Sequence, residues 1–275
     1  MLALAPIEKI DYLVIGHLSK DLTQEGARLG GSAAYASLTA RALGLRVGIV
    51  SAFNPKDLSL DALKNIPIIA VDSRATTIFE NIAFPDGRKQ ILHQRAAPIS
   101  LDGIPDIWKR ASIIHLGPVA GEVESQLPET FSPAFLGLTP QGWMRDWDGK
   151  GIVSPKRWSQ AEASLNRASA AVLSLEDVNE DENLIEEMSL ACRVLSITEA
   201  EEGARLYWNH DLRRFPAPKA ACLDSTGAGD IYAAAFFIRL HSTRDPWEAA
   251  RFATCLAAHS VQRSGVESVP TEEEI

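Results

Sequence analysis

Short apolar runs alternate along the chain with segments whose apolar residues recur at helical spacing. Tyr12-Leu13-Val14-Ile15 reads as a buried strand that ends at Gly16. Residues 32–43 follow with an Ala-rich helical pattern closed by Gly44. Further strands are predicted at 47–50, 66–71, 113–116, 171–175 and 193–198, and helices at 160–167 and 181–190. This alternation predicts an α/β fold with a mostly parallel sheet covered by helices on both faces.

Two hairpins interrupt the alternation. Residues 76–83 and 88–95 are strand-like and are joined by Phe84-Pro85-Asp86-Gly87, in which Pro presets φ and Gly accepts a positive φ. This hairpin is polar on at least one face, so we predict that it is an appendage to the α/β body. A second, shorter hairpin comprises residues 204–208 and 213–215.

The composition is that of a globular chain with one core. Of 275 residues, 46% are hydrophobic and 23% are charged. A chain of this length buries about three-quarters of its unfolded surface, so we predict a single domain over residues 1–275. The formal net charge of -9 argues against a nucleic-acid partner, because phosphate backbones demand a basic surface. A local pocket can still hold a small phosphate compound.

Cysteine usage and the N-terminus bear on the expected compartment. Cys192, Cys222 and Cys255 are widely spaced and form no Cys-x-x-Cys pair, which favours scattered core thiols. Residues 1–6 are apolar but too short, and lack the charge, for a signal peptide. No run approaches the roughly 18 apolar residues of a membrane span. These observations favour a cytoplasmic protein with no membrane partner.

The segment with the clearest chemical content is Asp224-Ser225-Thr226-Gly227-Ala228-Gly229-Asp230, which runs into an apolar helical pattern. Its small residues allow backbone N–H groups to converge. A helix N-terminus adds unpaired N–H donors and a partial positive charge, and together they make an anion hole for a phosphoryl group. The alternative is a Gly-rich turn in which Asp230 only caps the helix.

An earlier segment has a similar character. Leu29-Gly30-Gly31-Ser32 leads into an Ala-rich helical pattern, which indicates close approach of a polar ligand to a helix N-terminus. The alternative is tight packing with Ser32 as the N-cap. The sequence contains no GxxxxGK[ST], no GxGxxG after the first strand, no HExxH and no GxSxG.

Together the two glycine segments resemble those of the ribokinase-like (PfkB-type) carbohydrate kinase family, which has an early Gly-Gly and a late D-T-x-G-A-G-D. Ser225 stands where the family usually has Thr. The resemblance implies a ribokinase-like fold with a mostly parallel central sheet, flanking helices and a small β lid from about residues 17–31 and 76–95. It also implies transfer of the γ-phosphoryl group of ATP to a hydroxyl of a sugar-like molecule.

The resemblance assigns roles on the acceptor side. Asp230 falls on the catalytic base, and Gly227, Ala228 and Gly229 fall on the anion hole. Substrate contacts are implied for Asp21, Gly30 and Gly31. The family's ribokinases have Lys where this chain has Ser32, so ribose is not the expected substrate. The T-T-x-F-E segment at residues 76–80 resembles inositol kinases, which makes an inositol-like polyol one candidate.

On the donor side the resemblance implies ATP contacts for Ser174, Thr198 and Gly203, and a water-mediated Mg²⁺ contact for Asp177. Three positions depart from the family: Ala200 replaces a Gly, Ser174 an Asn and Asp177 a Glu. A shorter carboxylate still suits Mg²⁺, which usually keeps several waters. The residues that resemble the monovalent-cation loops of some members, and so make K⁺ a candidate, are Asp224, Arg263 and Gly265.

Two other functions stay open on the sequence alone. A nucleoside kinase of the same family would need an aromatic ring near the lid, for which Phe79 and Tyr35 are candidates. A member that binds ligand without catalysis would explain the altered positions 174, 177 and 200. Trp143 and Trp147 either pack on a sugar face or fill the core. The lid is also a candidate homodimer interface.

Overall fold

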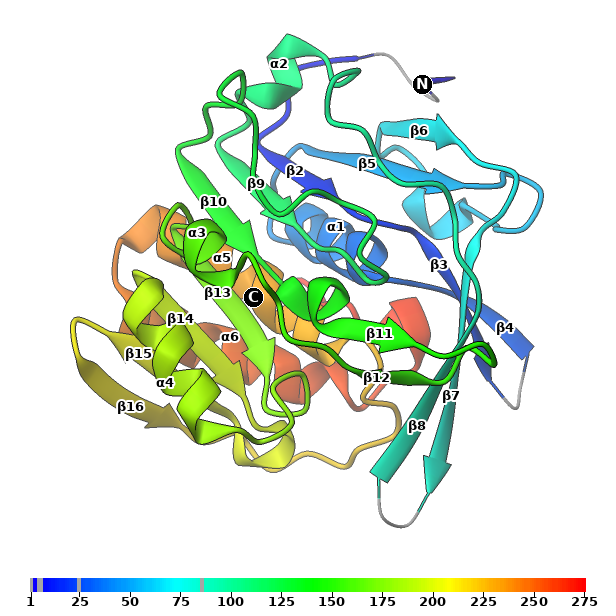
Figure 1. Ribbon diagram of the computed structural model, residues 1–275. Helices are drawn as coiled ribbons and strands as arrows, with labels where there is room; N and C mark the ends of the chain where they lie inside the picture. Colours follow the sequence, from blue (N-terminus) through cyan, green and yellow to red (C-terminus); the bar gives the residue numbers. More distant parts are fainter. Residues whose placement is uncertain (1, 4–6, 24–25, 85–86) are drawn as a thin grey trace.

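The predicted strands lie side by side in one large sheet of the computed structural model (Figure 1). In sheet order its strands are β1 (Leu2–Ala3), β6 (Ile68–Asp72), β5 (Val47–Phe53), β2 (Tyr12–Ile15), β9 (Ile113–Leu116), β10 (Phe135–Leu138), β13 (Ala170–Ser174), β14 (Val194–Thr198), β15 (Ala204–Trp208) and β16 (Asp211–Phe215). From β6 to β14 all neighbours pair in parallel, and the antiparallel pairs lie at the two edges. The predicted mostly parallel sheet is confirmed.

The structure describes residues 2–3, 7–23, 26–84 and 87–275, with backbone only at 2–3, 83–84 and 87–88. Two predicted features extend outside the described residues. One is the turn of the first hairpin, at Pro85 and Asp86, and the other is the N-terminal segment, at residues 1 and 4–6.

Helices cover both faces of the sheet (Figure 1). On one face lie α1 (Ser32–Ala42), α5 (Ala228–Thr243) and α6 (Pro246–Ser260), and on the other α2 (Asp106–Lys109), α3 (Ala161–Leu165) and α4 (Glu182–Ala191). Side chains of a strand alternate between faces, so Tyr12 and Val14 pack with the first group while Leu13 and Ile15 pack with the second. Burial on both faces explains why the run carries no polar residue.

A separate sheet stands beside the large one. Its strands, in order, are β4 (Gly26–Gly30), β3 (Ser19–Thr23), β7 (Thr77–Phe84) and β8 (Gly87–Gln94). The two chain segments expected to form a lid therefore share one sheet, in which β3 pairs antiparallel with β4 and parallel with β7. A short pair, β11 (Arg145–Trp147) and β12 (Val153–Pro155), packs against β8.

Two strand starts lie two residues from their predicted positions, and β5 ends at Phe53, three residues past its predicted end. The strand expected from residue 66 begins at Ile68, because Pro67 has no N–H to donate to a neighbouring strand. The strand expected from residue 213 begins at Asp211. Asn209 and His210 alone make the turn, with φ values of 51° and 62° that match a tight two-residue hairpin.

The tryptophans between β10 and α3 pack against hydrophobic clusters, Trp158 buried and Trp143 and Trp147 partly buried. Trp143 stacks on Trp158 with ring centroids 4.9 Å apart, and its Nε1 donates to the Val123 carbonyl at 2.7 Å. Trp147 lies 5.5 Å from the Arg95 guanidinium and packs with a small cluster that includes Phe79. These contacts support the core-filling interpretation over a sugar platform.

Gly137 of β10 lets α5 lie close to the sheet. A Cβ at this position would stand 2.6 Å from two ring atoms of Phe237. We therefore predict that Gly137→Ala lowers the free energy of unfolding by about 1–3 kcal/mol, since a close-packed core resists added volume. Urea unfolding measures this change. The matched control is Gly149→Ala, where an added Cβ meets nothing within 4 Å. An unchanged midpoint for Gly137→Ala would contradict the packing argument.

Candidate active site

The carboxyl ends of the central strands open into one large cavity. Ser174 ends β13, Thr198 ends β14, Thr139 follows β10, and all three line the cavity. Parallel sheets bind ligands at this edge. The cavity volume is about 1430 Å³. Pockets for one small molecule measure roughly 300–1,000 Å³, so the volume leaves room for two reactants.

Helix α5 begins inside this cavity. Gly227 precedes it in a left-handed conformation, and a Cβ there would lie 2.4 Å from the Tyr35 ring. Gly227, Ala228 and Gly229 all line the cavity at the first turn, where N–H groups lack helical partners. The Ala228 N–H donates to the Ser225 carbonyl at 3.2 Å within the turn. The backbone of this turn is therefore shaped to receive an anion.

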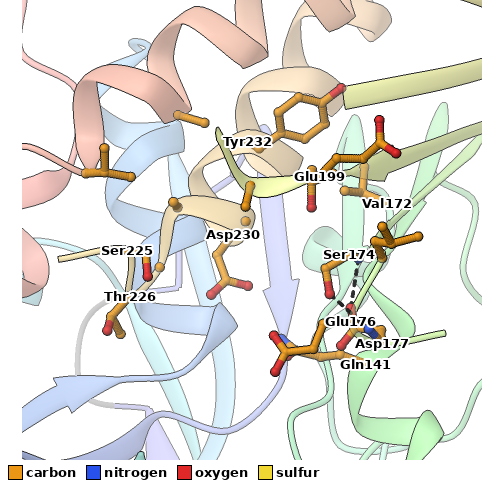
Figure 2. Close-up of a pocket in the computed structure, with 18 of the residues that line it drawn as sticks. Gln141, Val172, Ser174, Glu176, Asp177, Glu199, Ser225, Thr226, Asp230 and Tyr232 are labelled. Atoms are coloured by element: carbon orange, nitrogen blue, oxygen red, sulfur yellow. Dashed lines mark hydrogen bonds between the residues drawn. The ribbon is translucent and has the colours of Figure 1, made fainter. Parts of the chain in front are cut away.

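Asp230 lies in the first turn of α5 and points its carboxylate into the cavity (Figure 2). Its depth in the site raises its pKa to about 6. A hydrogen bond from Ser32 and the positive charge of Arg145 act in the opposite direction, while Asp177 and Asp21 raise the pKa further. A carboxylate with a pKa near the working pH is a better proton acceptor than an ordinary one.

A chain of hydrogen bonds holds Ser32 against Asp230. Arg145 Nη2 donates to Gln141 Oε1 at 2.7 Å, and Gln141 Nε2 donates to Ser32 Oγ at 2.9 Å. The Ser32 proton is thereby left for the Asp230 carboxylate. Ser32 is not the N-cap of α1, since Gly31 holds that place without a side-chain cap. The sequence analysis missed Gln141 and Arg145, which belong to no motif and reach the site only through folding.

The predicted substrate residues meet at the start of β3 and the end of β4. Ser19 Oγ donates to Asp21 Oδ1 at 2.9 Å, and Ser19, Asp21 and Gly31 all line the cavity. Gly30 makes room for the acid, because a Cβ there would lie 2.1 Å from Asp21 Oδ2. Gly31 has a φ of +89°, and its Cβ would lie 2.5 Å from the His17 carbonyl oxygen.

The separate sheet contributes a polar wall to the same cavity. Asn81 of β7 and Gln90 of β8 line it, and Gln90 Nε2 donates to Asn81 Oδ1 at 2.9 Å. Phe79 and Tyr35, the two aromatic candidates, also line it. The guanidinium of Arg145 lies 5.8 Å from the Phe79 ring. The hairpin beyond residue 76 thus faces the same space as Asp230.

Ser174 and Asp177 form a closed turn on the opposite side of the cavity. Ser174 N–H donates to Asp177 Oδ2 at 2.9 Å, and Asp177 N–H donates to Ser174 Oγ at 3.1 Å (Figure 2). The Glu176 carboxylate points into the cavity beside them. Carboxylates at the edge of a phosphate site suit Mg²⁺, which binds through one or two of them and retains water. This side therefore fits the expected ion.

In the loop from Thr198 to Gly203 two residues have a positive φ, although only one of them is glycine. Ala200 has a φ of 50°, the left-handed region that explains why the family has Gly there. Gly203 has a φ of +100°, and a Cβ would lie 2.0 Å from the Phe215 carbonyl oxygen. Glu199 Oε1 pairs with Arg205 Nε at 2.8 Å, which offsets its charge.

In the loop expected to bind a monovalent cation, the carboxylate of Asp224 contacts the guanidinium of Arg28. Asp224 Oδ2 accepts hydrogen bonds from Ser264 Oγ at 2.9 Å and from the Gly265 N–H at 3.2 Å, and Arg28 Nη1 lies 3.2 Å from the same oxygen. Arg263 instead binds Glu274 through both guanidinium nitrogens, at 2.7 and 2.8 Å. The residues present do not fit K⁺ at this carboxylate, contrary to the expectation, because a guanidinium already neutralises it.

Within the described ranges, no helix is long and apolar enough to cross a bilayer. The described side chains also contain no group of three or more His, Cys, Asp or Glu that could hold a metal by themselves. Of the three free thiols only Cys192 is buried. Cys222 is exposed and lines the cavity, which corrects the prediction of three core thiols.

Comparison with known proteins shows a similarity to one carbohydrate kinase family. Residues 159–273, less than half of the chain, match the model of the pfkB family carbohydrate kinases. A fructokinase homologue of Arabidopsis thaliana is 24% identical over 60% of the chain, a match that spans 57% of that homologue. The chain thus covers a little over half the length of this relative.

Two solved structures show the fold of the chain. A pyrophosphate-dependent kinase of the ribokinase family, complexed with a pyrophosphate analog and myo-inositol, superposes with a TM-score of 0.78 at 19% identity. The superposition covers 94% of this chain and 98% of that one. A sugar kinase from Pyrococcus horikoshii in complex with ATP gives 0.72 at 21% identity, covering 96% of both chains. The ribokinase-like fold is confirmed.

The hydrogen bond from Ser32 should be visible in the pH dependence of catalysis. If Asp230 must be ionised, kcat/KM falls as the pH drops through the Asp230 pKa of about 6. Ser32→Ala removes a bond that lowers this pKa, so its acid limb should move to higher pH. Initial rates across pH measure the shift. Ser242→Ala, at the far end of α5, is the control. An acid limb that stays in place in Ser32→Ala would contradict the assignment.

Proposed function

We propose that the protein transfers the terminal phosphoryl group of ATP to a hydroxyl of a small sugar or sugar-like polyol. Asp230 is the base, and Gly227, Ala228 and Gly229 form the anion hole. The observation that carries this proposal is the Asp230 carboxylate, raised to a pKa of about 6, beside the N-terminus of α5. Phosphoryl transfer depends on positioning and charge neutralisation more than on covalent help.

The reaction follows from the position of these groups. The acceptor oxygen forms a bond to the γ-phosphorus as the bond to the β–γ bridging oxygen breaks, and ADP leaves with that electron pair. Asp230 takes the proton of the acceptor hydroxyl. The N–H groups at the start of α5 face the phosphoryl oxygens, where charge is concentrated. Ser32, held by Gln141, orients the base.

Mg²⁺ bound with the donor neutralises phosphate charge. Glu176 and Asp177 are the residues that would face it, through water, on the side of the cavity opposite Asp230 (Figure 2). The Ser174–Asp177 turn holds the second of these carboxylates in one orientation.

The substrate side favours a compact polyol. Its wall combines a carboxylate (Asp21), two amides (Asn81 and Gln90) and the Gln141–Arg145 pair, all of which suit ring hydroxyls. The similar pyrophosphate-dependent kinase was solved with myo-inositol, so an inositol-like cyclitol is the first candidate. The separate sheet would act as the lid over this substrate. Its use as a homodimer interface and a cytoplasmic location remain predictions.

The donor side favours a nucleotide. The cavity lining includes four apolar residues, Val172 of β13 and Ala257, Ala258 and Val261 at the end of α6. Such residues suit contact with a nucleobase, whereas pyrophosphate has no apolar group to pack against them. Pyrophosphate is the second candidate donor, because the likeness to a pyrophosphate-dependent kinase extends over 94% of the chain.

The two other functions find less support in the site. A nucleoside kinase needs an accessible aromatic face, but Phe79 is covered by Arg145 and Tyr35 packs against Gly227. A protein that only binds ligand needs no base, yet desolvation inside the cavity raises the pKa of Asp230 beside the proposed anion hole.

Removing the base tests the catalytic assignment. Asp230→Asn keeps the shape of the side chain but cannot accept a proton, so kcat should fall by about 10²–10⁴-fold. Donor binding, measured by calorimetry with ADP, should change little. Asp102→Asn, on an exposed turn, is the control. A variant that turns over like the wild type would exclude Asp230 as the base.

A donor and acceptor screen tests the substrates. The purified protein is incubated with Mg²⁺ and either ATP or pyrophosphate against sugars, cyclitols and nucleosides, and phosphorylated products are measured. We expect a higher kcat/KM with ATP, and cyclitols or sugars ahead of nucleosides. A preference for pyrophosphate would overturn the donor assignment, and no product with any pair would favour ligand binding alone.

A further inference from the structure

Arg28 joins the separate sheet to the loop that leads into the anion hole. It lies on β4, and its Nη1 donates both to Asp224 Oδ2, at 3.2 Å, and to Ser264 Oγ. β4 also packs against the 3₁₀ turn η4 (Gly265–Ser268). The side chains of Arg28 and Asp224 are 30% and 20% exposed, so water screens this ion pair only in part.

Asp224 transmits this contact to the phosphate-binding turn. Its Oδ1 accepts the Thr226 N–H at 2.9 Å, one residue before Gly227, and its Oδ2 is the oxygen that Arg28 contacts. Burial opposes ionisation of Asp224, but hydrogen bonds from Thr226, Ser264 and Gly265 outweigh it and lower the pKa. The carboxylate is therefore an anion that needs a nearby positive charge, only three residues before Gly227.

We propose that Arg28 is a positioning residue that supplies this charge from within the chain. Its guanidinium stands in for a dissolved monovalent cation at Asp224 and fixes the 224–227 turn. Because the charge is carried by β4, the anion hole is fully shaped only while the separate sheet is docked. This inference rests on the proposed phosphoryl transfer, and it makes the reaction independent of K⁺ and Na⁺.

The geometry has a further consequence for the lid. Arg28 lies directly opposite Asp21 in the β3–β4 pair, so both side chains stand on one face of the separate sheet. Asp21 lines the substrate end of the cavity, whereas Arg28 reaches the donor loop. One strand pair thereby links the acceptor side to the donor side.

Cation dependence and chemical rescue test the proposal. Rates and ADP or pyrophosphate binding are measured with choline as the sole monovalent cation, then with K⁺ or Na⁺ at constant ionic strength. For wild type we expect no more than about a twofold change with either ion. Arg28→Ala should weaken anion binding and kcat/KM by about tenfold or more, since it removes hydrogen bonds between charged groups. Added guanidinium or K⁺ should restore a large part of both.

Matched variants separate this role from a structural one. Arg28→Lys should retain more activity than Arg28→Ala, and Lys89→Ala, an exposed cation on the same sheet, should behave as wild type. Activation of the wild type by K⁺ would overturn the proposal, as would an Arg28→Ala defect that neither ion rescues. Anion binding needs no acceptor, so it still decides the role of Arg28 if no acceptor is phosphorylated. Absence of turnover with any acceptor in wild type would count against the proposed function alone.

Discussion

The packing of α5 against the sheet is the constraint on which the site depends. Gly137 lets Phe237 lie against β10, so the helix axis runs close under the strands and its first turn emerges at their carboxyl ends. The segments that follow β9, β10, β13 and β14 at this edge all line the same cavity. The N–H groups and partial charge of the helix terminus provide a site for an anion in a chain of net charge -9.

The depth of Asp230 in the cavity makes its ionisation less favourable, and this changes what the carboxylate can do. Depth raises its pKa, and the charges of Asp177 and Asp21 add to the effect, while Ser32 and Arg145 limit it. The result is a carboxylate that is ionised near neutral pH yet still accepts a proton readily. Sites that combine a perturbed carboxylate with an anion-binding turn are typical of catalysis rather than of passive binding.

Around the cavity, several carboxylates contact positively charged or hydrogen-bonding groups that the fold holds in place. Arg28 faces Asp224, Arg205 faces Glu199, and the Ser174 N–H faces Asp177. The two Arg contacts join residues from different loops or strands, so the positions of those carboxylates follow from how the elements pack. The separate sheet takes part through Arg28 as well as through its polar wall.

The sequence by itself determined the fold class and the central motif. Apolar runs and helical patterns are local, and they predicted most strands of the large sheet. β1 and β10 were not predicted, β5 extends three residues past its predicted end, and Pro67 and a tight turn moved two strand starts by two residues. The spacing from Asp224 to Asp230 is also local, which is why an anion hole and a base could be predicted there. Only the tertiary structure decided that Gln141 and Arg145 support Ser32, or that Arg28 pairs with Asp224. Gln141 and Ser32, like Arg28 and Asp224, are more than 100 positions apart in the sequence. Local sequence patterns do not show which residues so far apart come into contact.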